Sequence, residues 1–121
     1  SKDIAFQIAG REGFKQAFQG AKPVLLEPIY NFVITVPDEF AGAVMSDLNT
    51  RRARVQGMGQ TGKKAVITAL APLAEMLQYA TNLRAITQGR GVYSMELSHY
   101  DVVPAHLTAQ IVEQAKVESE E

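Results

Sequence analysis

Two prolines in this chain each separate a strand-like segment from a helix-like segment, and this repeated order restricts the possible folds more than any other feature. Pro37 follows the alternating run 29–36, IYNFVITV, and Pro72 follows the β-branched run 64–71, KAVITALA. Proline cannot donate to a strand ladder, but its fixed φ angle suits the first turn of a helix. Each proline therefore predicts the end of a strand and the beginning of a helix.

The segments that follow these prolines have the apolar spacing of amphipathic helices. The expected buried stripes are Phe40, Ala41, Val44, Met45 and Leu48 in the first helix, and Leu73, Met76, Leu77, Ala80 and Leu83 in the second. Gly89 is a natural stop for the second helix. Two further runs, RVQGM at 54–58 and VYSMELSHY at 92–100, are typical of strands.

Residues 29–100 are therefore ordered β-α-β-β-α-β. Two right-handed β-α-β units around a hairpin predict an α+β fold, the ferredoxin-like two-layer sandwich. Both helices are expected to cover one face of a four-stranded antiparallel sheet. A short C-terminal helix is expected after Pro104, followed by the acidic tail EQAKVESEE.

An additional N-terminal helix is predicted for residues 3–21. Apolar residues recur there near helical spacing: Ile4, Ile8, Phe14, Ala17 and Phe18. Gly10 and Gly13 inside this segment each cost roughly 1 kcal/mol relative to alanine in a helix. Residues 22–28, KPVLLEP, begin and end close to a proline and are predicted to be an extended connector between two units.

The segment 57–64, GMGQTGKK, is similar to a phosphate-binding loop because Gly57, Gly62 and Lys63 match the pattern G-x-x-x-x-G-K. A working loop of that class joins a strand to a helix, whose N-terminal N–H groups point at the phosphates. Here a strand-like run follows, and Lys64 stands where a Ser or Thr would hold magnesium. The segment is therefore expected to be a hairpin connection rather than a nucleotide site.

The remaining composition argues against catalysis. There is no cysteine, and the two histidines, His99 and His106, do not have the spacing of metal ligands. The net charge is −1, so no overall field attracts nucleic acid or membranes. No apolar run approaches the roughly 20 residues of a membrane span. We expect a cytoplasmic chain that is not an enzyme, holds no cofactor or metal of its own, and does not bind membranes.

Arginines are concentrated in two short segments. NTRRAR at 49–54 ends the first predicted helix, and TQGRG at 87–91 ends the second. Both helices are expected to run the same way, so that the two segments share one edge of the sheet. Arginine suits bidentate contacts with phosphate, and an RNA-facing patch is therefore one interpretation. The other is that these cations only satisfy the last carbonyls and the dipole of each helix.

Three long stretches cover nearly the whole chain: AFQIAGREGFKQAFQGAKPVLLEPI, PDEFAGAVMSDLNTRRARVQGM and APLAEMLQYATNLRAITQGRGVYSMELSHYDVVP. They resemble the C-terminal end of bacterial elongation factor G. The resemblance implies that residues 1–27 are the last helix of domain IV and the interdomain connector. It implies that residues 28–121 are domain V, ferredoxin-like, with its C-terminal helix and tail. The GTPase domain of such a factor, with its GTP and Mg²⁺, lies outside this chain.

In that family, domain V docks on the large ribosomal subunit and supports translocation. The contacts are with rRNA of the stalk base and the sarcin–ricin region, with stalk-base protein, and with the other domains of the factor. Carried over by position, the resemblance implies rRNA contacts by Arg51, Arg52, Arg54, Thr87, Gln88 and Arg90. Lys63 and Lys64 lie in a hairpin loop that is expected to vary, and they are not included.

Several alternatives stay open at this point. MELSHYDVVPAHL and VMSDLNTRRARV look nearer to elongation-factor-G-like paralogues, and recycling and ribosomal protection factors share the architecture. A different class is a free-standing ferredoxin-like module that binds a small molecule or hydrolyses acyl phosphates. It would need an arginine–asparagine anion site in a strand-to-helix loop, and neither TVPDEF nor LAPLAE supplies one. The apolar face of the N-terminal helix is expected to dock on domain V or to form a dimer.

Overall fold

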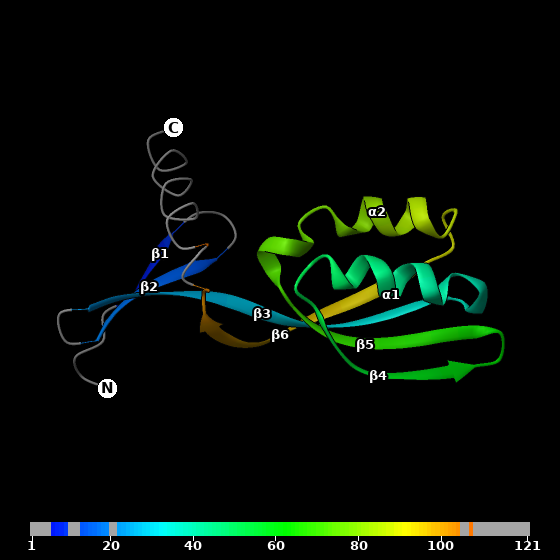
Figure 1. Ribbon diagram of the computed structural model, residues 1–121, viewed down its shortest axis with the longest axis horizontal. Helices are drawn as coiled ribbons and strands as arrows, with labels where there is room; N and C mark the ends of the chain where they lie inside the picture. Colours follow the sequence, from blue (N-terminus) through cyan, green and yellow to red (C-terminus); the bar gives the residue numbers. More distant parts are fainter. Residues whose placement is uncertain (1–5, 10–12, 20–21, 105–106, 108–121) are drawn as a thin grey trace. The chain divides into compact units, whose positions relative to one another are not determined.

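The structure is a computed structural model that describes residues 6–9, 13–19, 22–104 and 107 (Figure 1). The chain forms two compact units, one of residues Ile29–Ser98 and one of Ser1–Pro28 together with His99–Glu121. The predicted C-terminal helix and acidic tail fall outside the described residues, apart from Leu107, which is helical.

The unit Ile29–Ser98 contains the predicted order of strands and helices. The elements are β3 (Lys22–Pro37), the 3-10 helix η1 (Asp38–Phe40), α1 (Ala41–Asn49), β4 (Arg54–Thr61), β5 (Lys64–Pro72), the 3-10 helix η2 (Leu73–Met76), α2 (Tyr79–Ile86) and β6 (Val92–Val102). Pro37 and Pro72 are the last residues of their strands, and each directly precedes a 3-10 helix. The order β-α-β-β-α-β confirms the α+β, ferredoxin-like fold.

The strand pairing places β3 and β5 at the centre of the sheet of this unit. They are antiparallel, with Pro37 opposite Lys64. β4 pairs antiparallel with β5, and β6 pairs with β3. A β-bulge between Val55 and Gly57 shifts the register of β4.

The core lies between this sheet and the two helices, which cover the same face of it (Figure 1). Side chains alternate between the faces of a strand, and Ile34 of β3 and Ile67 of β5, which are opposite each other, both point inward and have no exposed surface. The helices add Val44, Leu48, Tyr79 and Leu83. Leu77, predicted to be buried, is 52% exposed, because residues 77–78 form a turn between η2 and α2 rather than part of one continuous helix.

The two helices run in opposite directions, which contradicts the prediction that their C-terminal ends share one edge (Figure 1). Arg51, just after α1, donates to the carbonyl of Glu75 in η2. Arg90, after α2, pairs with Glu39, which precedes α1. The prediction was wrong because α1 follows β3 whereas α2 follows β5, and these strands are antiparallel. The segments 49–54 and 87–91 therefore lie at opposite ends of the helix layer.

The N-terminal segment forms a hairpin in place of the predicted helix. Strands β1 (Phe6–Ala9) and β2 (Phe14–Gln19) pair antiparallel, and β2 pairs with the first part of β3. Gly13, at φ 76°, takes a left-handed conformation that suits a turn and interrupts a helix. Because the described residues of this segment are strands, they form no helical apolar face of the kind that was expected to dock or to form a dimer. Residues 22–28 are extended, as predicted, but they are a paired strand rather than a free connector.

The phenol of Tyr79 is buried inside the core of the unit Ile29–Ser98. Its ring packs edge-on against Phe32 and Tyr93, with centroids 6.3 and 5.3 Å away. Among the described residues its hydroxyl has no hydrogen-bond partner. Burial raises the pKa of this phenol far above its usual value, and the charge of Asp47 raises it further. An unsatisfied buried hydroxyl destabilises the fold.

Replacing Tyr79 with phenylalanine is therefore expected to raise the free energy of unfolding at pH 7 by up to about 1 kcal/mol, measured by urea unfolding.

The parent chain should also lose stability as the pH rises through about 10, because the Tyr79 phenol ionises in the unfolded chain but not in the buried site. Tyr79→Phe should lack that part of the alkaline loss. The half-buried Tyr30→Phe is the control. A Tyr79→Phe variant less stable than the parent at pH 7 would contradict the assignment.

Candidate nucleic-acid interface

Arg51 joins the end of α1 to η2. Its Nε donates to Asp47 Oδ2 at 2.9 Å, and its Nη1 donates to the carbonyl of Glu75 at 2.6 Å. The guanidinium lies 5.2 Å from the centre of the Tyr79 ring, within the range of a cation–π contact. The side chain is only 13% exposed. These contacts use Arg51 to hold two elements together and leave little of its side chain open to a ligand.

The other two arginines of segment 49–54 differ in exposure. Arg52 follows α1 in a left-handed conformation, at φ 57°, and its Nε lies 3.3 Å from Glu75 Oε2. Arg54 is the first residue of β4, and its side chain is exposed. Arg54 is therefore the residue of this segment that best presents a cation to solvent.

Thr87 builds the turn that ends α2. Its hydroxyl donates to the carbonyl of Leu83 at 2.7 Å and accepts the N–H of Gly91 at 2.8 Å. The side chain is fully buried, and the next residue, Gln88, is left-handed at φ 55°. Thr87 thus shapes the turn from inside, while Gln88 and Arg90 are exposed on its outer side.

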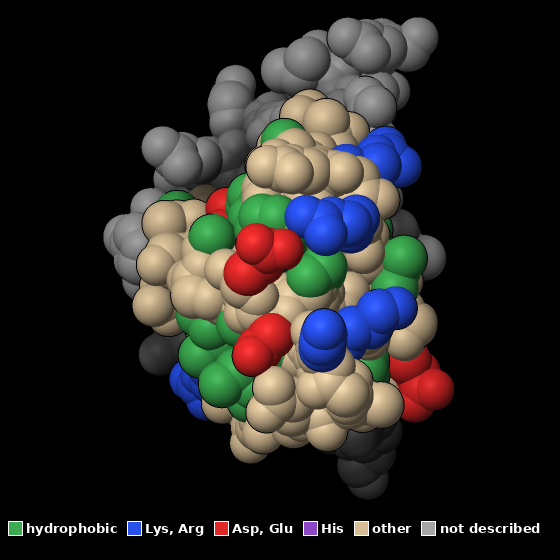
Figure 2. Space-filling model, turned by 90° about the vertical axis from the view of Figure 1, so that its right-hand side faces the viewer, with side chains coloured by type: hydrophobic (Ala, Val, Ile, Leu, Met, Phe, Trp, Pro, Cys, Tyr) green, Lys and Arg blue, Asp and Glu red, His purple; other side chains and the backbone are tan. Residues whose placement is uncertain are grey.

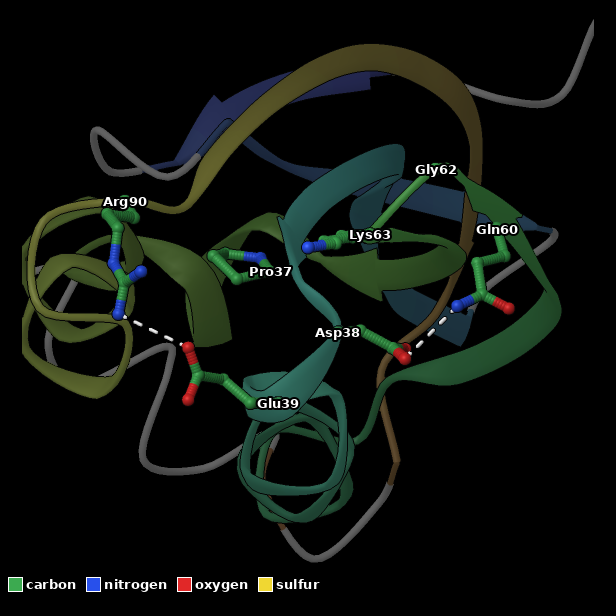
Figure 3. A pocket seen from close by; sticks show the side chains of 7 residues that line it. All are labelled: Pro37, Asp38, Glu39, Gln60, Gly62, Lys63 and Arg90. Carbon is green, nitrogen blue, oxygen red and sulfur yellow. Dashed lines mark hydrogen bonds and ion pairs between the residues drawn. The ribbon is translucent and has the colours of Figure 1, made fainter.

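A cleft with a volume of about 530 Å³ lies where the end of β3, the β4–β5 hairpin and the turn after α2 meet (Figure 3). Its lining residues are Pro37, Asp38, Glu39, Gln60, Gly62, Lys63 and Arg90. The N–H of Asp38 donates to the carbonyl of Lys63 at 2.9 Å, and Gln60 Nε2 donates to Asp38 Oδ2 at 3.1 Å. Arg90 Nη2 lies 3.3 Å from Glu39 Oε1.

The cations of this cleft are accessible from solvent. Lys63 and its neighbour Lys64 are exposed, and the side chain of Arg90 is 53% exposed. Lysine and arginine side chains gather on this face of the molecule, with carboxylates beside them (Figure 2). Ammonium and guanidinium groups donate to phosphate oxygens, and Gln88, exposed in the same turn as Arg90, carries an amide that can also donate a hydrogen bond. The exposed cations can therefore contact phosphate groups, although Asp38 and Glu39 line the same cleft and balance their charge.

A family model described as Elongation factor G C-terminus matches residues 24–111. The chain belongs to the elongation factor G family. The elongation factor G of Aquifex pyrophilus is 50% identical over 112 residues, which are 93% of this chain and 16% of that protein. A crystal structure of a protein from Thermus thermophilus is 48% identical, with a TM-score of 0.73, over 79% of this chain and 14% of that one. The chain thus spans less than a fifth of the length of these relatives.

The elongation factor G resemblance suggested one group of six contact residues, and the structure separates them. Arg51, Arg52 and Arg54 lie at the end of the helix layer that contains Glu75. Thr87, Gln88 and Arg90 lie at the opposite end, beside Glu39. Thr87 is buried, and Arg51 is nearly so.

Lys63, which the sequence interpretation left out, lines the same cleft as Arg90. A signal for this was present in the expected topology. In an antiparallel β3–β5 pair the hairpin before β5 must lie at the end of β3, and Pro37 is indeed opposite Lys64. The hairpin that carries Lys63 therefore meets the residues that follow β3.

In this chain, the glycine-containing segment 57–64 is a hairpin, as predicted. β4 ends at Thr61, β5 begins at Lys64, and Gly62 at φ 62° makes the turn between them. The segment therefore lacks the strand-to-helix geometry that would fit the phosphates of GTP. No group of three or more potential metal ligands, and no helix long and apolar enough to cross a membrane, is found within the described ranges.

Proposed function

We propose that this chain is the ribosome-docking C-terminal part of an elongation factor G-type GTPase and that it supports translocation. Its partners would be rRNA of the stalk base and the sarcin–ricin region, stalk-base protein and the other domains of the factor. Residues 1–27 would be the end of domain IV and 28–121 domain V. GTP and Mg²⁺ would bind to the GTPase domain of the factor, and the role of this chain would be binding rather than catalysis.

One observation carries the choice of docking surface. Lys63 and Arg90 line one cleft, and both are exposed. Phosphate contacts from such cations position a protein on RNA without reading its sequence. We assign the primary rRNA contact to the hairpin 60–64 and the turn 87–91, with Gln88 and Arg90 retained from the six residues that the resemblance implied. Thr87 shapes the turn 87–91 from inside, whereas Arg51 and Arg52 hold elements together at the opposite end of the unit. Arg54 is the residue with which that opposite end is tested.

The test is an NMR titration of the ¹⁵N-labelled chain with stalk-base and sarcin–ricin RNA hairpins, at low and at physiological salt, with an unrelated hairpin as control. Shifts should be confined to residues 60–64 and 87–91 and should be stronger for the ribosomal hairpins. Replacing Arg90 with glutamine should weaken binding roughly three- to tenfold and reduce the salt slope by about 1, because one phosphate contact is lost.

The matched variant is Arg54→Gln, which removes the same charge at the opposite end of the unit. It should leave the affinity nearly unchanged. A larger loss of RNA affinity with Arg54→Gln than with Arg90→Gln would place the docking surface at the other end of the unit. Equal binding of the unrelated hairpin would remove the support for a ribosomal role of this surface.

A further inference from the structure

The carboxylate of Glu39 already forms an ion pair with Arg90 in the cleft. Glu39 Oε1 lies 3.3 Å from Arg90 Nη2, and the two side chains point toward one another (Figure 3). The neighbouring carboxylate of Asp38 is engaged differently, because it accepts a hydrogen bond from Gln60. Glu39 is therefore the acidic group placed where a phosphate oxygen would bind Arg90.

We propose that Glu39 competes with phosphate for Arg90 and thereby sets the affinity of this cleft for RNA. This inference rests on the proposed function. The side chains of Arg90 and Glu39 are 53% and 64% exposed, so water and salt weaken their attraction and the pair opens readily. A phosphate can accept two parallel hydrogen bonds from a guanidinium, whereas a single contact joins Arg90 to Glu39. Phosphate is thus the stronger partner once it is in place.

The surroundings keep Arg90 in position when Glu39 leaves. Its guanidinium lies 5.2 Å from the centre of the Phe40 ring, which gives the cation a second contact that does not depend on Glu39. The backbone hydrogen bond from Asp38 to Lys63 ties the hairpin to the start of η1. The exchange therefore needs only a rotation of the exposed Glu39 side chain.

This competition also sets the minimum strength of contact that a ligand of the cleft must supply. A single weakly held phosphate must displace Glu39 and remain near its negative charge. An RNA that offers one phosphate to Arg90 and another to Lys63 gains two contacts for the same displacement. Glu39 thus lowers the affinity for both kinds of ligand by the same displacement, and the second contact, to Lys63, decides which of them still binds well.

The experiment compares Glu39→Gln with Glu96→Gln, an exposed residue of β6 outside the cleft that removes the same charge. Affinity for the sarcin–ricin hairpin is measured by titration of each ¹⁵N-labelled chain, in the parent and in the Arg90→Gln background. Glu39→Gln should bind roughly three- to fivefold more tightly than Glu96→Gln, the range expected for release of one exposed ion pair. In the Arg90→Gln background the difference should disappear.

Equal affinities of Glu39→Gln and Glu96→Gln, or a gain that persists without Arg90, would overturn the inference while leaving the RNA-binding role in place. A parallel titration with inorganic pyrophosphate separates the two ideas. If no hairpin binds but pyrophosphate binds Glu39→Gln more tightly than Glu96→Gln, the competition stands and the RNA role fails. If neither ligand binds any variant, both are overturned.

Discussion

Arg51→Met should lower the free energy of unfolding by about 2–3 kcal/mol. The methionine keeps much of the apolar length of arginine but none of its donors. The carbonyl of Glu75 and the carboxylate of Asp47 then lose the partners that Arg51 supplies at 2.6 and 2.9 Å. The cation over the Tyr79 ring is lost as well. Chemical denaturation at pH 7 measures the effect.

Arg54→Met is the matched control, because it removes the same charge from an exposed side chain of the same segment. The stability of Arg54→Met should change by less than about 0.5 kcal/mol.

Under conditions where Arg51→Met is folded, the affinity of this variant for the rRNA hairpins should equal that of the parent chain. A loss of RNA affinity comparable to that of Arg90→Gln would show that Arg51 is a contact residue after all.

Gly91→Ala should lower the free energy of unfolding by about 1–3 kcal/mol. A Cβ at this position would lie 2.8 Å from Thr87 Oγ1 and 3.0 Å from Leu83 Cγ, which are both buried. Neither atom is the end of a long flexible side chain, so the turn after α2 must shift. The hydrogen bond from the Gly91 N–H to Thr87 would be strained at the same time.

Because this turn presents Gln88 and Arg90, Gly91→Ala should also weaken RNA binding. Gly42→Ala is the control, since Gly42 lies in α1 and a Cβ there would meet nothing within 4 Å. Alanine at position 42 should raise stability by roughly 0.5–1 kcal/mol through its helix propensity. If thermal unfolding shows that Gly91→Ala is as stable as Gly42→Ala, the close packing at the turn does not prevent a side chain at position 91.

The order of elements could be predicted from the sequence because its determinants are local. Pro37 and Pro72 act on their own residues and on the next turn, and the apolar spacing of each helix is set within a few residues. The N-terminal hairpin could not be predicted in this way. Its apolar residues fit a helical period, and the strand form depends on pairing with residues 22–28 and on the left-handed Gly13.

The candidate site depends on contacts between distant residues, which propensities do not encode. Arg90 and Glu39 are 51 residues apart in the sequence, and their pairing follows only from the antiparallel arrangement of the two helices. Thr87 and Arg51 have polar side chains of a kind that contacts RNA, and the sequence offered no sign that one is buried and the other 13% exposed. Exposure, rather than residue type, separates the positioning residues from those that can meet a ligand.

The β-bulge in β4 affects how the chain behaves when it is concentrated. β4 is the last strand in the order of its sheet and its residues are largely exposed, and such an edge is a template for another chain to add a strand. A bulge bends the strand and increases its twist, which spoils the match to a straight incoming strand. Gly57 and Gly59 also offer it no side chains to pack against. We therefore expect the bulge to hinder edge-to-edge aggregation along the first part of β4.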